Sequence, residues 1–228
     1  MRLDKCLSEM GAGSRAFVKE LIRKGRVSVN GSVCKEPERA VNESDVFTVD
    51  GEPLKYSAFE YYMLYKPAGY LTARADDNRP VVMELLPLKR KDLSPVGRLD
   101  ADTEGLLLIT NDGALNHKLT APKSGIPKKY FARFDGIFPE DAEEILSKPV
   151  AFQDFVSSPA ELQRISENEA FLTVTEGKFH EVKRLFHHIG CEVTYLKRVE
   201  FAGLTLGDLE KGAFRALSED EVNYLKNL

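Results

Sequence analysis

The sequence predicts an α+β protein made of a small module with two helices and a short sheet, followed by a larger domain with a mainly antiparallel mixed sheet. Three observations predict this class. Two short segments with helical spacing precede alternating segments near the N-terminus. Strand-like segments then outnumber helical ones. The connections are also too short for regular crossover helices, which favours antiparallel pairing. We therefore expect domains at residues 1–57 and 58–228.

The composition is that of a folded protein. The chain has 228 residues, 43% hydrophobic and 30% charged, which excludes a disordered tail and leaves room for a buried core. Its apolar runs are shorter than the ~20 residues of a membrane helix, and the N-terminus lacks the apolar core of a secretory signal. Cys6, Cys34 and Cys191 are widely spaced. They exclude a disulfide scaffold or a cysteine zinc site and favour a cytoplasmic location.

Positive charge is concentrated near the N-terminus. Residues 1–35 carry eight Lys and Arg against three acids, a net charge of +5. Residues 58–228 carry 22 bases and 27 acids, a net charge of −5. A small basic piece in an otherwise acidic protein is typical of a nucleic-acid contact surface. An ordinary solvated helix face is the alternative that charge alone leaves open.

The first two expected elements are helices. Residues 2–10 have two leucines four apart on one face, and a pair of glycines ends the segment. Ser14 is placed to cap a second helix, residues 15–24, which Gly25 stops. The apolar positions of the second helix follow the helical spacing: Phe17, Val18, Leu21 and Ile22. Its basic side chains therefore project away from the apolar face.

Strands follow these helices. Residues 26–34 alternate around Asn30-Gly31, a strong hairpin signal, and residues 45–49 form a further strand before Asp50-Gly51. The "RLDKCL" opening, the "SR" cap and the "VNG" turn fall in the order that resembles the S4 RNA-binding domain. The resemblance implies contact with structured RNA through phosphates and shape. The implied RNA-binding residues are Arg2, Lys5, Ser14, Arg15, Lys19, Arg23, Lys24, Arg26 and Asn30.

The larger part has the mixed pattern of an α+β domain. Six strands are expected: residues 61–65, 106–110, 129–134, 160–165, 170–175 and 192–201. Four helices are expected: residues 80–86, 139–147, 180–188 and 218–227. Pro139 suits the first position of its helix and Ser218 suits a helix cap, whereas Asn111-Asp-Gly is expected to form a turn.

The segment "VGRLDADTEGLLLIT", residues 96–110, carries the densest polar pattern. Asp100, Asp102 and Glu104 alternate before a glycine, as at the start of a calcium loop. The twelfth position of that loop should be a glutamate but is Asn111, and residues 106–110 are strand-like rather than helical. A calcium site is therefore disfavoured, and we expect no metal.

The same segment, in the form GRLDxxTxGLL, resembles the catalytic signature of the pseudouridine synthases. The resemblance implies that Asp100 is the essential residue, that Tyr130 of "KKYFARF" stacks on the target base, and that Lys183 of "EGKFHEVKRLF" pairs with the carboxylate. It also implies substrate contacts from Arg98, which fills the gap left by the flipped base, and from Arg184 and Leu185. Glu181 replaces the commoner Gln, which leaves open whether Lys183 or Arg184 makes the ion pair.

Together with the S4 resemblance, "GKFHEVKRLF" looks most like the small-subunit (16S) ribosomal RNA pseudouridine synthases. Isomerising uridine breaks the N1–C1′ bond, turns the base and rejoins it through C5. No group is gained or lost, so we expect no cofactor. The reaction requires a carboxylate with a positive partner, and the uridine must leave its stack. The expected partner is small-subunit rRNA or its assembly intermediate, bound by a monomer without membrane contact.

Ordinary interpretations compete with each assignment. Tyr130 lies in an alternating strand, where tyrosine usually packs, and Lys183 lies on an amphipathic helix, where lysine is usually solvated. The three histidines at 180, 187 and 188 suit phosphate contact or exposure better than a metal site. A large-subunit (23S) rRNA synthase and a non-catalytic S4 assembly factor are the competing functions. The second of these leaves the Asp-Tyr-Lys set unexplained.

Overall fold

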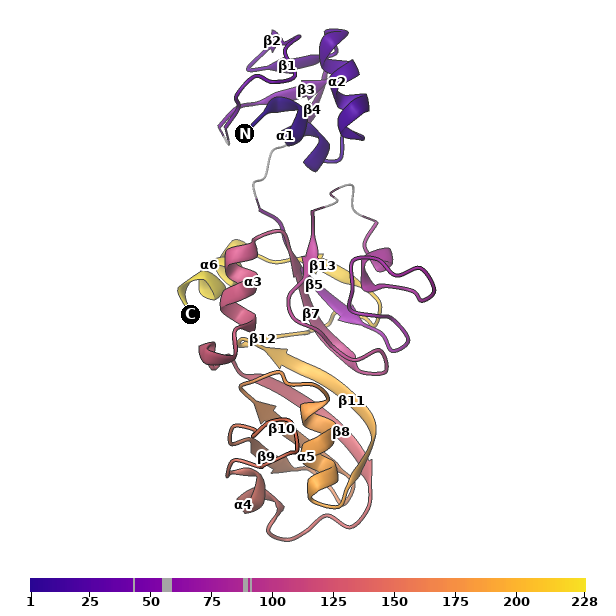
Figure 1. Ribbon diagram of the computed structural model, residues 1–228, viewed down its shortest axis with the longest axis vertical. Coiled ribbons are helices and arrows are strands. Elements are labelled where there is room, and N and C mark those ends of the chain that lie inside the picture. Colours follow the sequence, from indigo (N-terminus) through magenta and orange to yellow (C-terminus); the bar gives the residue numbers. More distant parts are fainter. Residues whose placement is uncertain (43, 55–58, 88–89, 91) are drawn as a thin grey trace. The chain divides into compact units, whose positions relative to one another are not determined.

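The computed structural model describes residues 1–42, 44–54, 59–87, 90 and 92–228 (Figure 1). The chain forms two compact units, one of Met1–Glu60 with Pro87–Leu93 and one of Tyr61–Leu86 with Ser94–Leu228. The expected boundary between residues 57 and 58 lies outside the described residues. No helix in the described part of the chain is long and apolar enough to cross a membrane.

The first unit begins with the two expected helices, α1 (Leu3–Glu9) and α2 (Arg15–Arg23). Ser14 caps α2, its hydroxyl accepting a hydrogen bond from the backbone N–H of Phe17 at 3.2 Å. The apolar face of α2 is narrower than predicted, because the Phe17 side chain is exposed and lies against Gly13. The buried side chains of α2 are Val18, Leu21 and Ile22.

A four-stranded antiparallel sheet completes this unit, in the order β2-β1-β3-β4. Its strands are β1 (Val27–Val29), β2 (Ser32–Val33), β3 (Phe47–Val49) and β4 (Glu52–Leu54). Asn30 and Gly31 both have positive φ, 52° and 78°, as the tight turn between β1 and β2 requires. The amide of Asn30 also donates to Asp45 at 2.7 Å, so this residue ties the turn to the segment that precedes β3.

The second unit is built on a mixed sheet with strand order β13-β5-β7-β11-β8-β10-β9. The strands are β5 (Tyr61–Lys66), β6 (Ser94–Pro95), β7 (Glu104–Thr110), β8 (Lys128–Asp135), β9 (Glu161–Arg164), β10 (Glu169–Val174), β11 (Glu192–Phe201), β12 (Leu204–Thr205) and β13 (Phe214–Ala216). All described pairs are antiparallel except β7 with β11. The predicted α+β class and mainly antiparallel sheet are therefore confirmed.

The parallel contact between β7 and β11 joins the two halves of this sheet. Gly105 on β7 has φ +113°, and a Cβ there would collide with the backbone of Arg198 on β11. Only glycine combines this close approach with such a backbone conformation. The approach matters for function because the segment just before β7, residues 98–103, is held beside β11.

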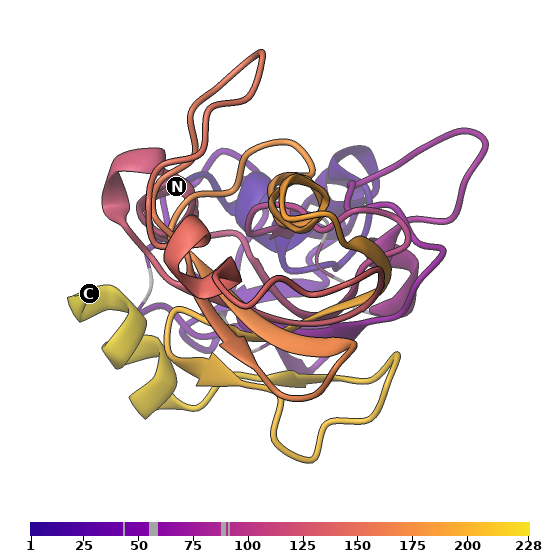
Figure 2. The same cartoon turned by 90° about the horizontal axis from the view of Figure 1, so that it is seen from below.

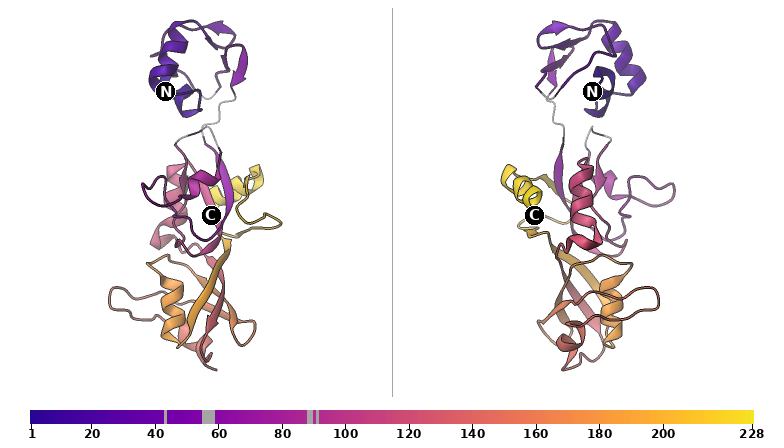
Figure 3. Two further views of the ribbon diagram at one scale, coloured as in Figure 1. Left: turned by 90° about the vertical axis from the view of Figure 1, so that its right-hand side faces the viewer. Right: turned by 60° about the vertical axis from the view of Figure 1, so that its left-hand side comes forward.

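Helices cover the sheet. They are η1 (Val82–Leu85), α3 (Gly113–Thr120), η2 (Pro122–Ser124), α4 (Ala142–Leu146), α5 (Glu181–His188) and α6 (Glu219–Asn227). Helices α3 and α6 lie side by side (Figure 3) and share one core with β5 and β7, formed in part by Met63, Leu106, Leu119 and Leu225. Helix α5 lies over β8 and β11 (Figure 2), where the rings of Phe186 and Phe134 are 5.2 Å apart.

Two helical expectations need correction. A turn was expected at Asn111-Asp-Gly and no helix after it, but Asp112 caps helix α3, one carboxylate oxygen accepting from the N–H of Leu115 at 3.0 Å. The other oxygen accepts from the Tyr61 hydroxyl at 2.9 Å, so the cap is also fixed to β5. Helix α4 is shorter than the predicted residues 139–147, because Pro139 belongs to the preceding turn and Asp141 is the cap.

Candidate active site

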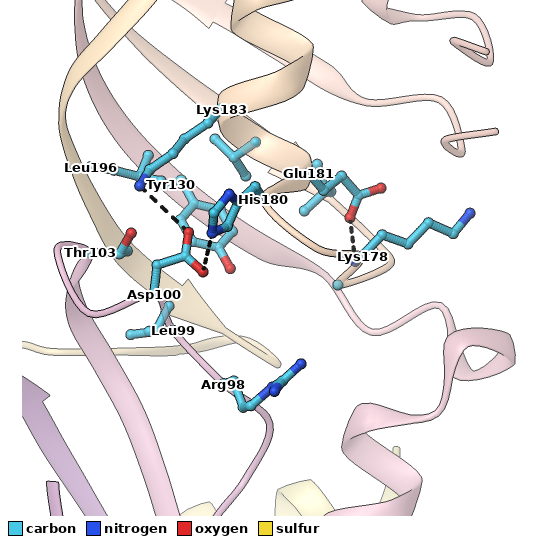
Figure 4. Close-up of a pocket in the computed structure, with 13 residues that line it drawn as sticks. Arg98, Leu99, Asp100, Thr103, Tyr130, Lys178, His180, Glu181, Lys183 and Leu196 are labelled. Atoms are coloured by element: carbon cyan, nitrogen blue, oxygen red, sulfur yellow. Dashed lines mark hydrogen bonds and ion pairs between the residues drawn. The ribbon is translucent and has the colours of Figure 1, made fainter. Parts of the chain in front are cut away.

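A pocket in the second unit brings together three segments that are far apart in the sequence (Figure 4). The loop before β7 contributes Asp100, strand β8 contributes Tyr130, and the start of α5 contributes Lys183. The pocket is lined by Arg98, Leu99, Asp100, Thr103, Tyr130, Val174, Gly177, Lys178, His180, Glu181, Val182, Lys183 and Leu196. The structure therefore places the three expected catalytic residues, and Arg98, around one cavity.

A buried lysine fixes the loop that carries Asp100. Lys66 is 0% exposed, and its Nζ lies between four backbone carbonyl oxygens. The distances are 3.1 Å to Pro67, 3.0 Å to Asp100, 3.1 Å to Ala101 and 2.7 Å to Thr103. Burial lowers the pKa of Lys66 to about 8. The four carbonyl oxygens supply the hydrogen-bond acceptors that the buried ammonium group requires. The main chain of the loop is thereby held while the Asp100 carboxylate stays free to face the pocket.

We expect Lys66→Met to destabilise this unit and to lower turnover. The change leaves buried carbonyl oxygens without a donor, which costs about 1–3 kcal/mol for each group that finds no replacement. Urea unfolding followed by circular dichroism measures the loss. Lys148→Met is the matched control, because Lys148 forms an exposed pair with Glu144 and should change stability by at most ~0.5 kcal/mol. Equal stability of the two variants would contradict this role of Lys66.

The Asp100 carboxylate has a basic partner near each oxygen. Lys183 Nζ is 3.6 Å from Oδ2, and His180 Nε2 is 3.6 Å from Oδ1. Lys183 also donates to both oxygens of Asp102, each at 2.7 Å. Burial raises the pKa of Asp102, but the Lys183 bonds outweigh burial and hold that pKa below its ordinary value. Lys183 therefore sits between two carboxylates of one loop.

The geometry distinguishes Lys183 from Arg184. Arg184 is the next residue of α5 after Lys183, and its guanidinium points to Asp154, with Nη1 3.0 Å from Oδ2. It also lies 4.5 Å from the ring centres of Phe152 and Phe155. Arg184 is not among the residues that line the pocket, whereas Lys183 is. The structure brings Lys183, and not Arg184, to Asp100.

Glu181 and Leu185 are turned inward. Glu181 is 4% exposed and accepts a hydrogen bond from the backbone N–H of Lys178 at 3.1 Å, while burial raises its pKa. Its carboxylate thus closes the turn before α5 and does not pair with Lys183. Leu185 is 0% exposed, belongs to the core and is not among the residues that line the pocket, so its substrate contact stays a prediction.

Tyr130 forms part of the pocket wall. Its side chain is 8% exposed and projects from β8 into the pocket lining. This position agrees both with a packing role and with contact to a bound base. Thr103 is also a pocket residue, and its hydroxyl has no hydrogen-bond partner within the described residues. His180 and Thr103 were not assigned to the site from the sequence. The threonine of the GRLDxxTxGLL pattern and the histidine of "KFHEV" were the signals available.

Several expected RNA-binding side chains of the first unit also bind within the protein. Asp4 is 0% exposed, and its carboxylate lies 3.0 Å from Arg2, 3.3 Å from Arg15 and 3.7 Å from Lys19. Burial raises the pKa of Asp4, and the hydrogen bonds from Arg2 and Arg15 overcome it, so the pKa is lowered. These three cations therefore surround one buried acid and still present exposed surface.

The other basic residues differ from one another in their pairing. Lys5 lies 3.7 Å from Glu9, Lys24 lies 2.6 Å from Glu20, and Arg26 pairs with Asp50. Arg23 is exposed and forms no ion pair within the described part of the chain. Ser14 and Asn30 hold a helix cap and a turn, as described above. Among the described residues, no group of three His, Cys, Asp or Glu side chains could hold a metal ion.

The pocket thus combines a carboxylate, a lysine and a tyrosine, and it follows in sequence a basic module of two helices and a small sheet, which is the arrangement expected of an enzyme that acts on RNA. The sequence pattern of the RNA pseudouridylate synthase family matches residues 60–188, and that of the S4 domain matches residues 1–47. The chain belongs to the RNA pseudouridylate synthase family and carries an N-terminal S4 domain. It is an isomerase that forms pseudouridine in RNA.

Individual relatives cover nearly the whole chain. An RNA pseudouridine synthase of Aquifex aeolicus (strain VF5) is 41% identical, covering 100% of this chain and 97% of its own. The ribosomal large subunit pseudouridine synthase B of Bacillus subtilis (strain 168) is 38% identical, covering 100% and 96%. The ribosomal small subunit pseudouridine synthase A of Escherichia coli (strain K12) is 36% identical, covering 97% and 98%. A pseudouridylate synthase crystal structure matches with a TM-score of 0.69, 30% identity and 99% coverage of both chains.

Proposed function

We propose that this enzyme converts one uridine of small-subunit (16S) ribosomal RNA to pseudouridine. The observation that carries the proposal is the segment "GKFHEVKRLF", residues 177–186, which resembles the small-subunit enzymes and forms one wall of the pocket. Identity over the whole chain does not separate the two classes, since the small-subunit relative is 36% identical and the large-subunit relative 38%. Large-subunit rRNA is therefore the second candidate substrate.

In this proposal each pocket residue has one task. Asp100 is the residue that acts on the target nucleotide, either by attacking C1′ or by removing a sugar proton. Lys183 is its positive partner at 3.6 Å. Tyr130 stacks on the extruded base, and Arg98 occupies the gap left in the RNA. Extrusion costs a few kcal/mol, which contacts of this kind must offset.

The substrate is tested by supplying both ribosomal RNAs to the purified full-length chain. Small- and large-subunit transcripts, with and without their assembly proteins, are incubated with the enzyme, and pseudouridine is then mapped chemically along each RNA. The proposal expects one new site, in the small-subunit RNA. A site in the large-subunit RNA would replace the proposed substrate by the second candidate.

We expect activity to survive exhaustive chelation. Isomerisation gains and loses no group, and the carboxylates of Asp102 and Glu104 have protein partners, Lys183 and Lys211 at 2.7 and 2.9 Å. Single-turnover rates before and after treatment with a chelator provide the measurement. The RNA is refolded in monovalent salt beforehand, so that loss of its magnesium is not mistaken for loss of a protein-bound ion. Activity restored only by calcium or magnesium under those conditions would revive the metal interpretation.

The S4 domain is proposed to supply RNA affinity. Reversing the charges of Arg15 or Lys19 would also place an acid beside buried Asp4, so Arg23 is the cleaner target. We expect Arg23→Ala to weaken RNA binding and to reduce the salt slope of log K by about one for each lost phosphate contact. Rates at saturating RNA should change little. The salt slope of Lys24→Ala is the comparison, because the Lys24 side chain already forms an ion pair with Glu20 within the protein. An unchanged salt slope for Arg23→Ala would remove this residue from the interface.

We also propose that the enzyme acts as a monomer in the cytoplasm. Its substrate is made there, and Cys6, Cys34 and Cys191 are all free and buried. Burial raises the pKa of Cys6 to about 11, which keeps its thiol protonated and unreactive. Sedimentation of the chain at assay concentration tests the monomeric state.

A further inference from the structure

His180 occupies a position in the pocket that none of the proposed tasks uses. Its Nε2 lies 3.6 Å from Asp100 Oδ1, while Lys183 Nζ lies 3.6 Å from Oδ2 (Figure 4). His180 immediately precedes α5 and Lys183 lies in the first turn of that helix, so both side chains come from the same end of α5. The Asp100 carboxylate is thus held from two directions by one helix end.

The imidazole of His180 packs against the neighbouring aromatic ring. The His180 ring stacks on the Phe179 ring, with ring centres 3.9 Å apart and an angle of 18° between their planes. His180 also has a left-handed backbone, with φ 51° and ψ 28°, which non-glycine residues seldom adopt. Together the backbone and the stacked ring direct Nε2, rather than Nδ1, toward the carboxylate. A side chain with no task at the site would gain nothing from this arrangement.

The surroundings of His180 are strongly charged. The loop before β7, strand β8 and α5 with its preceding turn all contribute groups to the pocket. Besides His180, the titratable and charged side chains that line the pocket are Arg98, Asp100, Tyr130, Lys178, Glu181 and Lys183. Asp102 lies outside this lining but interacts electrostatically with His180. Because Lys183 is shared with Asp102 at 2.7 Å, it is not available to Asp100 alone. The orientation of the Asp100 carboxylate then depends on a second donor near Oδ1, and His180 Nε2 is the group at that position.

We propose that His180 is a positioning residue, which holds Oδ1 of Asp100 through its Nε2 so that the carboxylate faces the target nucleotide in one orientation. The inference rests on the proposed role of Asp100. The 3.6 Å separation is an ion-pair distance, and it shortens to a hydrogen bond when the bound nucleotide excludes water from the pocket.

Two amide variants test the proposal. The amide nitrogen of glutamine can take the place of Nε2, whereas that of the shorter asparagine takes the place of Nδ1. We expect His180→Gln to keep single-turnover rates within about tenfold of the wild-type chain, and His180→Asn to lose about 100-fold, the usual effect of a 1 Å misplacement. Asparagine tolerates a left-handed backbone better than glutamine does, so backbone strain predicts the opposite order.

The readout is tritium release from 5-tritiated uridine in the ribosomal RNA that the wild-type chain modifies, with enzyme in excess and RNA affinity measured separately. Affinity should be equal for all three chains.

Three results would overturn the proposal. They are equal rates for the two amide variants, an Asn variant faster than the Gln variant, and weakened RNA affinity with unchanged saturated rates. The last would make His180 an RNA contact instead. Thermal midpoints equal to that of the wild-type chain exclude misfolding. Asp100→Asn is assayed in parallel, and turnover by that variant would refute the role of Asp100 whatever the His180 variants do.

Discussion

Asp100→Asn should abolish isomerisation while folding and RNA affinity stay near those of the wild-type chain. A carboxamide can neither attack C1′ nor take a proton. The substitution keeps the backbone carbonyl that Lys66 binds at 3.0 Å, so the loop should keep its conformation. We expect the single-turnover rate to fall by 10⁴-fold or more, roughly the loss seen when a residue acting on the reacting atoms is removed. Tritium release from 5-tritiated uridine in RNA measures it.

Asp102→Asn is the matched control for this prediction. The chemical change is the same, it lies two residues away, and Asp102 also binds Lys183 at 2.7 Å. The Asp102 side chain is 73% exposed, against 31% for Asp100, and Asp102 is not among the residues lining the pocket. We expect a loss of about tenfold or less, caused by the changed position of Lys183. Equal losses in the two variants would contradict the assignment of Asp100.

Lys183→Met should give the second largest effect on the rate. It removes the ammonium group 3.6 Å from Asp100 Oδ2 and leaves two carboxylates of one loop without their shared cation. Removing one charged or hydrogen-bonding group of this kind from an active site costs about 10²–10³-fold in rate. The loss should appear in the rate at saturating RNA, with RNA affinity little changed. Lys183→Arg should recover part of the rate because it restores the charge.

Arg184→Met is the control for Lys183. The Arg184 guanidinium binds Asp154 and lies over the rings of Phe152 and Phe155, away from the pocket. Its removal should lower the stability of the 151–158 loop and leave the saturated rate within about tenfold of the wild type. A larger loss of rate in Arg184→Met than in Lys183→Met would reverse the assignment of the ion pair.

The fold could be predicted where local pattern and tertiary structure agree. The Asn30-Gly31 turn, the 192–201 strand and the helix capped by Ser218 are all found as expected. Helix α3 was missed because the Asn111-Asp-Gly sequence reads locally as a turn. In the fold Asp112 caps a helix, supported by Tyr61 from a strand 51 residues earlier in the chain.

The site was predictable as far as family motifs reached. Those motifs named Asp100, Tyr130 and Lys183, which the structure places around one pocket. They could not separate Lys183 from Arg184, since that depends on the rotation of α5 against the loop. Nor could they reveal Lys66, whose four carbonyl partners come together only in the folded chain.

The charge of the N-terminal module was predictable in sum but not in its pairing. Residues 1–35 carry a net charge of +5, and this count contains no information on which cations face one another. Asp4 gathers Arg2, Arg15 and Lys19 because the packing of α1 against α2 buries its carboxylate among them. Part of the expected RNA-binding surface therefore also compensates the buried charge of Asp4.

Pseudouridine mapping in living cells tests the central claim most directly. Both ribosomal RNAs are mapped in a strain that lacks this chain and in the same strain supplied with either the wild-type chain or Asp100→Asn. We predict one pseudouridine in small-subunit RNA that is absent from the deletion strain, restored by the wild-type chain and not restored by the Asn variant. Restoration by the Asn variant, or no difference in either RNA between the deletion strain and the complemented one, would contradict the account.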